Sequence, residues 1–215
     1  MKHHNSGLSF IVLGMIDEEA PQFSPDLQAL IAQHRIFSGG RRHRELVAAL
    51  LPEDALWIDI TVPLEDVYAQ YRQHDAPVVV FASGDPLFFG FTTTLMREFP
   101  GRVERTVPSF SSLQMLAHAL RLPYHDMYVV SLTGRPWHEF DRALIERRAK
   151  VGVLTDKKHT PSVIAQRMLD YGYEGYTMHI GVLLGGERQE TYSLPLEDVP
   201  GRDFAHPNCL ILEHK

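Results

Sequence analysis

Short apolar runs alternate with longer stretches of helical periodicity along the first half of the chain. The runs are rich in Val, Ile, Leu and Phe, as strands buried inside a parallel sheet tend to be. They cover residues 8–14, 36–39, 56–60 and 77–82. The helix candidates between them cover residues 27–34, 41–51 and 63–74. This alternation predicts an α/β lobe with a mostly parallel sheet.

The second half of the chain also alternates strand patterns with helix patterns. Strand patterns cover residues 127–132, 150–155, 176–184, 188–194 and 209–213, and helix patterns cover residues 111–122, 139–149 and 160–172. The run at 188–194 alternates polar and apolar side chains, which is typical of an antiparallel strand. The last helix pattern begins with Thr160 as N-cap and ends at Gly172. We therefore expect two closely joined α/β lobes, residues 1–106 and 107–215, the second with a mixed sheet.

Composition narrows the class of protein. With 215 residues and 44% hydrophobic content, the chain can bury one large core or two modest ones. No apolar run approaches the roughly 18–20 residues of a membrane span, and the single cysteine, Cys209, excludes an intramolecular disulfide framework. A formal net charge of −6 argues against nucleic-acid binding, and the twelve scattered histidines predict no metal site. We expect a soluble cytoplasmic protein.

Open α/β sheets bind ligands at the carboxyl ends of their strands, so the residues after each strand pattern are candidates for a site. Ser83-Gly84-Asp85-Pro86 follows the run at 77–82. Glycine lets a ligand approach the backbone closely, and Asp85 offers an acceptor for a ribose hydroxyl or a cationic group. Two interpretations stay open: a ligand-binding loop, or a strand-to-helix turn with Asp85 as N-cap.

Serines mark a second candidate loop. Ser111 and Ser112 lie at a predicted helix N-terminus, where unpaired N–H groups and hydroxyls can hold polar ligand atoms. Simple capping by Ser109 or Ser111 would also explain them. Neither a G-x-x-x-x-G-K-S/T loop nor a G-x-G-x-x-G fingerprint is present, so common nucleotide-binding folds are disfavoured.

Basic residues follow three other strand patterns. Gly39-Gly40 opens a helix pattern whose first turn carries Arg41 and Arg42. Positive charge there opposes the helix dipole, and arginine suits planar recognition of carboxylates, so we expect an anionic ligand; a solvated charged face is the alternative. Gly134-Arg135 is interpreted either as a turn or as another contact for an anion. Lys157 and Lys158 could bind an acidic substrate, or they could lie in an ordinary surface loop. The histidines, His43 among them, are interpreted as structural.

In combination, four segments resemble the tetrapyrrole (corrin/porphyrin) methylase family. They read FSGGRRHREL (37–46), FASGDPLFFG (81–90), VPSFSSLQMLAHALRLPYHDMYVVSLTGR (107–135) and VGVLTDKKHTPSVIAQRML (151–169). The Gly-Asp-Pro loop is typical of the family. The GGRRH segment and the long third segment are similar to its branch of cobalt-precorrin-7 C5-methyltransferases, which also forms the N-terminal half of precorrin-6Y C5,15-methyltransferases.

The resemblance implies a two-lobed fold with a ligand cleft between the lobes. It also implies methyl transfer from S-adenosylmethionine to C5 of a (cobalt-)precorrin macrocycle in cobalamin biosynthesis. The residues it implies for the cofactor are Ser83, Gly84, Asp85, Phe88, Ser111, Ser112, Leu154 and Leu184. Arg41, Arg42 and Arg135 are hypothetical partners of the substrate's carboxylates, and no catalytic acid or base is identified. A homodimer is expected, with C15 methylation and decarboxylation left to a separate protein or domain.

The segment after the first strand pattern departs from the family. Family members carry a G-x-G-P-G loop there, whereas this chain reads GMIDEEAP, in which only Gly14 remains. Two alternatives therefore stay open beside C5 methylation. One is a sister tetrapyrrole methylase that acts at another position, and the other is a degenerate, non-catalytic domain that binds a tetrapyrrole.

Overall fold

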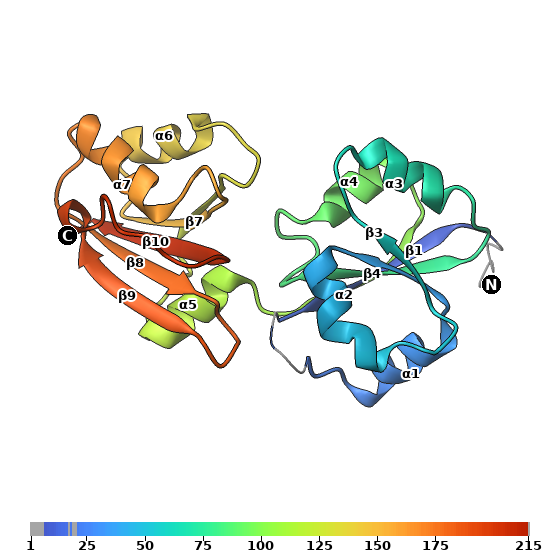
Figure 1. Cartoon of the computed structure of the whole chain (residues 1–215). Helices are drawn as coiled ribbons and strands as arrows, with labels where there is room; N and C mark the ends of the chain where they lie inside the picture. Colours follow the sequence, from blue (N-terminus) through green and yellow to red (C-terminus); the bar gives the residue numbers. More distant parts are fainter. Residues whose placement is uncertain (1–6, 17, 19–20, 215) are drawn as a thin grey trace. The chain divides into compact units, whose positions relative to one another are not determined.

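The chain folds into two compact units, Met1–Ser111 and Ser112–Lys215, each built on its own five-stranded sheet (Figure 1). The computed structural model describes residues 7–16, 18 and 21–214. Within this part of the chain, no helix combines the length and the apolar character needed to cross a membrane. The predicted α/β class is confirmed.

The sheet of the first unit is entirely parallel, with strand order β3-β2-β4-β1-β5. Its strands are β1 (Ser9–Met15), β2 (Ile36–Gly39), β3 (Leu56–Asp59), β4 (Pro77–Ser83) and β5 (Val103–Val107). Every residue of β1 is buried, which explains why its sequence is a continuous apolar run. In the register of β1 and β4, Gly14 pairs with Ala82 and Met15 with Ser83. The carboxyl ends of the two central strands therefore meet.

Two pairs of helices cover the two faces of this sheet (Figure 1). The helices are α1 (Pro25–Gln33), α2 (Arg41–Val47), α3 (Leu64–Tyr71) and α4 (Phe91–Glu98), and a 3-10 turn, η1 (Ala48–Leu50), follows α2. Ile31 of α1 and Val47 of α2 share one core with Phe37 and Phe81. The cores of α3 and α4 form on the opposite face around Tyr71 and Leu95.

The structure corrects three details of the predicted first lobe. Strand β5 was not predicted, because its sequence Val-Glu-Arg-Thr-Val is polar in the middle and its central residues are exposed at a sheet edge. Helix α4 was also missed, because three consecutive threonines weaken its helical pattern. The helix predicted over residues 41–51 ends at Val47 and continues only as η1.

The sheet of the second unit is mixed, as predicted, with strand order β6-β7-β10-β8-β9. Its strands are β6 (Tyr128–Ser131), β7 (Lys150–Leu154), β8 (Tyr176–Val182), β9 (Glu190–Pro195) and β10 (Asn208–His214). Only β6 and β7 pair in parallel; β9 is antiparallel to β8, which confirms the interpretation of its alternating sequence.

Helices cover both faces of this second sheet as well. Helices α6 (His138–Ile145) and α7 (Pro161–Asp170) pack with the 3-10 turn η2 (Leu196–Asp198) on one face, and α5 (Ser112–Leu120) covers the other. The predicted start of α7 is confirmed, since Thr160 Oγ1 accepts a hydrogen bond from the N–H of Val163 at 3.3 Å. The helix ends at Asp170 with Tyr171 as its C-cap, so the predicted C-cap, Gly172, lies one residue too far along the chain. Gly172 follows the helix with φ +75°, the left-handed conformation that ends many helices.

Candidate functional site

Three loops of the first unit converge at the carboxyl ends of β1, β4 and β5. A Cβ atom on Gly14 would lie 2.2 Å from the carbonyl oxygen of Gly84 and 2.8 Å from the nitrogen of Ser109. A Cβ atom on Gly84 would lie 3.1 Å from Cα of Ser111, and Gly84 has φ +66°. All of these neighbours are backbone atoms, so only glycine fits at Gly14, and any residue other than glycine is strained at Gly84.

Asp85 shapes the loop that follows β4. Its Oδ1 accepts a hydrogen bond from the N–H of Leu87 at 2.9 Å, and its carbonyl oxygen accepts one from Phe88 at 3.0 Å. Helix α4 begins only at Phe91, with Gly90 as its N-cap. The interpretation of Asp85 as a helix N-cap is therefore wrong, since its carboxylate closes a local turn instead.

Helix α2 brings a histidine to the same strand ends. Nε2 of His43 lies 2.9 Å from Oγ of Ser83, and Nδ1 of His43 accepts a hydrogen bond from the N–H of Gly40 at 3.2 Å. The sequence interpretation gave His43 no contact with the loop after β4. A contact between residues 43 and 83 has no signal in the sequence spacing, because it depends on β2 and β4 being neighbours in the sheet.

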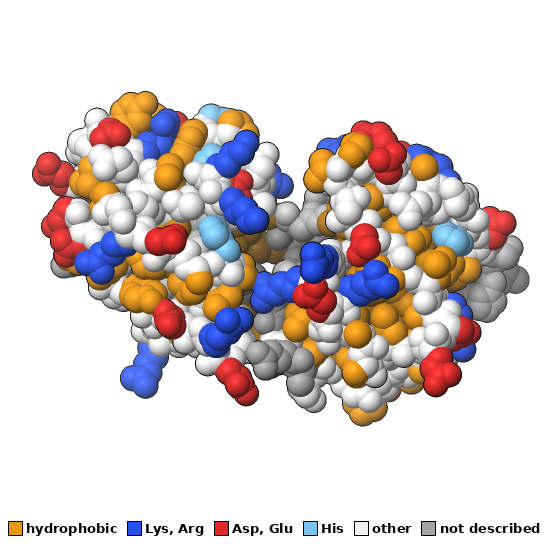
Figure 2. Space-filling model, viewed as in Figure 1, with side chains coloured by type: hydrophobic (Ala, Val, Ile, Leu, Met, Phe, Trp, Pro, Cys, Tyr) orange, Lys and Arg blue, Asp and Glu red, His pale blue; other side chains and the backbone are white. Residues whose placement is uncertain are grey.

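Acidic side chains accompany the arginines of α2. Arg41 Nε lies 3.1 Å from Oε1 of Glu45, and Arg44 lies 3.7 Å from Oδ2 of Asp59. Figure 2 shows basic and acidic side chains interspersed over this part of the surface. These carboxylates offset part of the unfavourable charge at the start of α2, so the dipole argument for a bound anion is weaker than the sequence indicated. A role for Arg41 and Arg42 in substrate binding stays a prediction.

In the second unit, three of the residues predicted for the cofactor gather around Cys209 of β10. Leu154 and Gly181 both pair with Cys209 in the sheet, and a Cβ atom on Gly181 would lie 2.7 Å from Cδ1 of Leu184. The side chain of Ser112 hydrogen-bonds with the thiol of Cys209. Burial raises the pKa of that thiol to about 12, so Cys209 contributes packing and no nucleophile.

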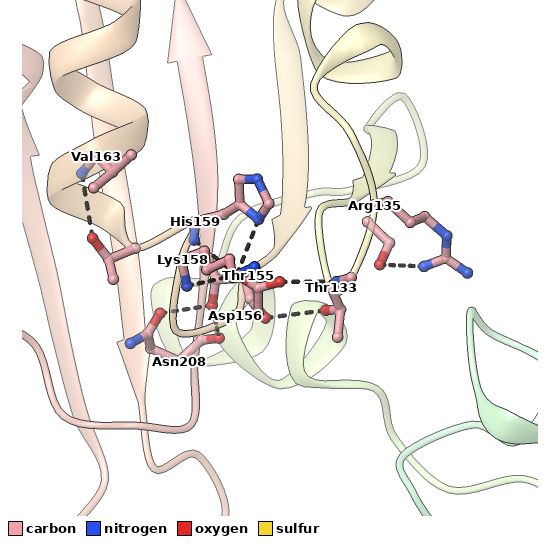
Figure 3. Close-up of polar contacts among 11 residues, drawn as sticks. Thr133, Arg135, Thr155, Asp156, Lys158, His159, Val163 and Asn208 are labelled. Carbon is pink, nitrogen blue, oxygen red and sulfur yellow. Dashed lines mark hydrogen bonds and ion pairs between the residues drawn. The ribbon is translucent and has the colours of Figure 1, made fainter. Parts of the chain in front are cut away.

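A carboxylate that the sequence interpretation missed joins the loops after β6 and β7 (Figure 3). Oδ2 of Asp156 accepts a hydrogen bond from the N–H of Gly134 at 2.8 Å. Its Oδ1 accepts two more, from the N–H groups of Lys158 at 2.8 Å and His159 at 2.7 Å. An aspartate directly after a strand pattern and shortly before a helix start was the available signal, whereas the sequence interpretation of this loop rested on the lysines at 157 and 158.

The loop after β6 also carries Arg135. Its guanidinium donates a hydrogen bond to Oγ of Ser131 at 2.7 Å, and Thr133 Oγ1 donates one to the carbonyl oxygen of Thr155 at 3.0 Å (Figure 3). Ser131 is buried at the carboxyl end of β6. The loop that carries Arg135 is thus anchored at a strand end, where the sequence analysis expected ligand contacts.

We expect Asp156→Asn to remove a stabilising effect that is present at neutral pH and is lost at acid pH. Partial burial tends to raise the pKa of Asp156, but the backbone donors and His159 outweigh it and lower the pKa to about 2. In the unfolded chain the Asp156 carboxyl has its usual pKa of about 4. The ionised carboxylate therefore stabilises the fold by about 1–2 kcal/mol above about pH 4, and this stabilisation is lost as the pH falls towards 2.

Urea unfolding at pH 7, 4 and 2.5 measures this effect. The difference in free energy of unfolding between wild type and Asp156→Asn is expected to shrink on going from pH 7 to pH 2.5. Asp203→Asn, at an exposed position, is the matched control and is expected to leave the pH dependence unchanged. A constant difference at all three pH values would contradict the role assigned to Asp156.

The comparison with known families decides the class of this two-unit structure. Residues 25–200 match the Tetrapyrrole (Corrin/Porphyrin) Methylases. The chain belongs to the tetrapyrrole methylase family. The resemblance inferred from the four sequence segments is therefore confirmed.

Curated relatives agree with this assignment. The chain is 30% identical over 205 residues to the cobalt-precorrin-7 C(5)-methyltransferase of Salmonella typhimurium, covering 95% of this chain and 98% of the relative. It is 33% identical over 177 residues to the decarboxylating precorrin-6Y C(5,15)-methyltransferase of a Sinorhizobium species. That match covers 81% of this chain but only 42% of the Sinorhizobium protein.

Solved structures share the fold at low sequence identity. A uroporphyrin III C-methyltransferase from Thermus thermophilus superposes with a TM-score of 0.69 at 21% identity, covering 95% of this chain and 97% of that one. A precorrin-6Y methylase from Archaeoglobus fulgidus gives 0.67 at 16% identity, covering 97% and 99%. The predicted fold class is confirmed by these neighbours.

Proposed function

We propose that this chain is an S-adenosylmethionine-dependent C-methyltransferase of cobalamin biosynthesis that methylates C5 of a precorrin or cobalt-precorrin. The observation that carries the proposal is the backbone cradle formed by Gly14, Gly84 and the segment around Ser111. Membership of the family and the end-to-end match with the Salmonella C5-methyltransferase support the reaction class.

The residues at the cradle fit S-adenosylmethionine. Ser83 and Asp85 offer a hydroxyl and a carboxylate beside the close-packed glycines, which suits the amino-acid and ribose parts of that molecule. Phe88 lies half-buried in the same loop. One structural neighbour, the Thermus uroporphyrin-III C-methyltransferase, was solved with S-adenosylhomocysteine. We assign Ser111 to the same ligand; for Ser112, Leu154 and Leu184, which belong to the second unit, binding of the cofactor stays a prediction.

The bound cofactor would supply a methyl group on a sulfonium, which is a good leaving group. The protein's own contribution is then mainly to hold the cofactor through Ser83 and Asp85 and to keep the reacting atoms in line away from water. Positioning of this kind is worth on the order of 7–11 kcal/mol in well-oriented reactions. The electron-rich meso carbon of the macrocycle is the nucleophile, so the proposal names no general base.

Substrate recognition is assigned to arginines at the strand ends. Arg135 is held by Ser131, and Arg41 and Arg42 lie in the first turn of α2. Precorrins carry several carboxylates, and a guanidinium pairs with a carboxylate through two parallel hydrogen bonds. We propose that these three arginines bind the substrate's peripheral carboxylates.

We expect Arg135→Gln to raise KM for the tetrapyrrole about tenfold while leaving the affinity for S-adenosylmethionine unchanged. Loss of one charge-assisted hydrogen bond accounts for a change of this size. Steady-state kinetics with varied tetrapyrrole, combined with calorimetry of cofactor binding, separates the two effects. Arg105→Gln on β5, at an exposed position, is the matched control. Equal kinetics for the two variants would remove Arg135 from the proposed substrate site.

The match with the Sinorhizobium enzyme concerns methylation at C15 and decarboxylation. The chain spans 42% of that decarboxylating C(5,15) enzyme but 98% of the Salmonella C(5) enzyme. We infer that C15 methylation and decarboxylation belong to a separate domain or protein. A homodimer remains our expectation, and light scattering of the purified chain tests it.

The departure after the first strand supports a second candidate function, a non-catalytic tetrapyrrole-binding domain. Part of that loop, residues 17 and 19–20, lies outside the described residues. Gly14, in contrast, is fixed by the backbone of two other loops, so its retention is explained by packing. Calorimetry discriminates the candidates, since the degenerate domain is expected to bind a tetrapyrrole but not S-adenosylmethionine.

A further inference from the structure

Two exposed apolar side chains border the backbone cradle of the first unit. Leu87, in the loop after β4, is 51% exposed, and Phe110, shortly after β5, is 58% exposed. Their loops meet at Gly14, since a Cβ atom there would lie 2.9 Å from Cδ of Pro86 and 2.8 Å from the nitrogen of Ser109. Leu87 and Phe110 are the next residues along these two loops. The two apolar side chains therefore belong to adjoining segments at the carboxyl end of the sheet.

The backbone that carries these side chains is closely held. Oδ1 of Asp85 accepts a hydrogen bond from the N–H of Leu87 at 2.9 Å, and the carbonyl oxygen of Asp85 accepts one from Phe88 at 3.0 Å. The carbonyl oxygen of Phe110 lies 3.2 Å from the position of a Cβ atom on Gly84. Because this backbone is already fixed, binding a ligand against Leu87 and Phe110 costs little additional ordering of the loops.

The proposed reaction indicates what covers the two side chains. Methyl transfer requires the attacking carbon to lie about 3–3.5 Å from the group that it attacks. With the cofactor at the cradle of Gly14 and Gly84, the tetrapyrrole must lie against the residues that border this cradle. Leu87 and Phe110 border it and present apolar surface, which suits the hydrocarbon face of a macrocycle.

Basic side chains on the other side of the loop after β4 fit the same ligand. The start of α2 lies beside the end of β4, because Nε2 of His43 is 2.9 Å from Oγ of Ser83. Arg41 and Arg42 precede this histidine in the first turn of α2. Phe110 lies beyond β1, since the strands follow the order β2-β4-β1-β5. Arginines on one side and apolar groups on the other match an apolar ring that is bordered by carboxylates.

We propose that Leu87 and Phe110 bind the ring of the tetrapyrrole substrate and form an apolar floor beside the cofactor cradle. The inference rests on the proposed function and adds two residues that contact the macrocycle itself to the arginines assigned to its carboxylates. The apolar floor fixes the plane of the ring, whereas the arginines fix which edge of the ring faces the cofactor. Contact between the ring and Phe110 also keeps water away from the reacting atoms.

The affinity of variants for uroporphyrin, a tetrapyrrole with carboxylates around its ring, tests the proposal. Phe110→Ala is expected to weaken binding about tenfold and Leu87→Ala about threefold, because the first variant removes more apolar surface. Phe110→Leu keeps an apolar side chain of similar reach and is expected to recover most of the affinity. Calorimetry with S-adenosylhomocysteine is expected to give wild-type affinity for all three variants, since neither side chain is assigned to the cofactor.

Ionic strength separates the apolar contact from the charged ones. The loss caused by Phe110→Ala is expected to be the same at low and at high salt. The loss caused by Arg41→Gln is expected to shrink at high salt, because exposed charges are screened. Met96→Ala, on α4, is the matched control, since Met96 is also a large exposed apolar residue of the first unit. This variant is expected to bind both ligands like wild type.

Several results would overturn the proposal. One is wild-type affinity for uroporphyrin in Phe110→Ala, and another is a failure of the wild type to bind uroporphyrin. Weaker binding of S-adenosylhomocysteine by Phe110→Ala would assign this side chain to the cofactor instead. A changed oligomeric state of Phe110→Ala in light scattering would assign it to an interface between copies of the chain.

The same measurements distinguish failure of this inference from failure of the proposed function. If the wild type binds S-adenosylhomocysteine but Phe110→Ala and Leu87→Ala bind uroporphyrin as the wild type does, the apolar floor alone is wrong. If uroporphyrin binding depends on Phe110 as expected but neither S-adenosylmethionine nor S-adenosylhomocysteine binds, the proposed methyl transfer fails. The tetrapyrrole contact of Phe110 then stands without it.

Discussion

Asp85→Ala is expected to weaken the binding of S-adenosylmethionine about 30-fold. Two effects add: the variant loses an acceptor beside the cradle, and it loses the Oδ1 contact with the N–H of Leu87 that closes the loop. A hydrogen bond to a charged group contributes roughly 1.5–3 kcal/mol, which spans the expected loss. Isothermal calorimetry with S-adenosylmethionine and S-adenosylhomocysteine measures it.

Asp85→Asn separates the two effects. Asparagine keeps an oxygen for the Leu87 N–H, so the turn is expected to persist while the negative charge is lost. Affinity between that of wild type and that of Asp85→Ala is the expected result. Asp75→Ala, at an exposed position, controls for the loss of a carboxylate elsewhere in the unit. Wild-type affinity in Asp85→Ala would place the cofactor away from this loop.

The sequence predicted the buried strands well because strands buried on both faces consist mostly of apolar residues. Strands β1 and β4 lie in continuous apolar runs, and the end of α7 carries its glycine where the chain turns into the left-handed conformation. Elements whose own sequence lacks a clear apolar pattern were not predicted. The polar edge strand β5 and the threonine-rich helix α4 are stabilised by neighbours in the fold, not by a pattern in their own sequence.

The candidate site divides in the same way. Gly84 and Asp85 could be singled out because they follow a predicted strand directly and combine a glycine with an acceptor side chain. The contacts of His43 with Ser83 and of Asp156 with Gly134 could not be predicted, because the partners are 40 and 22 residues distant in sequence. Sequence spacing carries no information on such pairs until the strand order is known.

The two units contribute different kinds of support to the proposed reaction. In the first unit, close-packed backbone and a few polar side chains gather at the ends of parallel strands. In the second, Asp156 ties together the loops after β6 and β7 and so fixes the segment that carries Arg135. The proposed cofactor contacts at the strand ends of the first unit and the proposed substrate contact of Arg135 in the second unit are thus each supported within their own unit.

Gly14→Ala is expected to be the most damaging single change in the first unit. The new methyl carbon would lie 2.2 Å from the carbonyl oxygen of Gly84, far inside van der Waals contact, and neither strand end can retreat without breaking the pairing of β1 with β4. We expect the free energy of unfolding to fall by about 3 kcal/mol. Cofactor affinity is expected to fall more than a hundredfold, because the loop after β4 must shift.

Urea unfolding and calorimetry on the same preparations measure both effects of Gly14→Ala. Gly7→Ala, just before β1, is the matched control, because its Cβ atom would meet only a guanidinium nitrogen of Arg102 at 3.6 Å, an ordinary contact. If Gly14→Ala retains wild-type stability and cofactor affinity, the loops after β1 and β4 are not packed on each other as described, and the cradle cannot be the cofactor site. If stability falls but affinity persists, Gly14 is a packing residue alone, and the cofactor must be held by the loop after β4 without the support of β1.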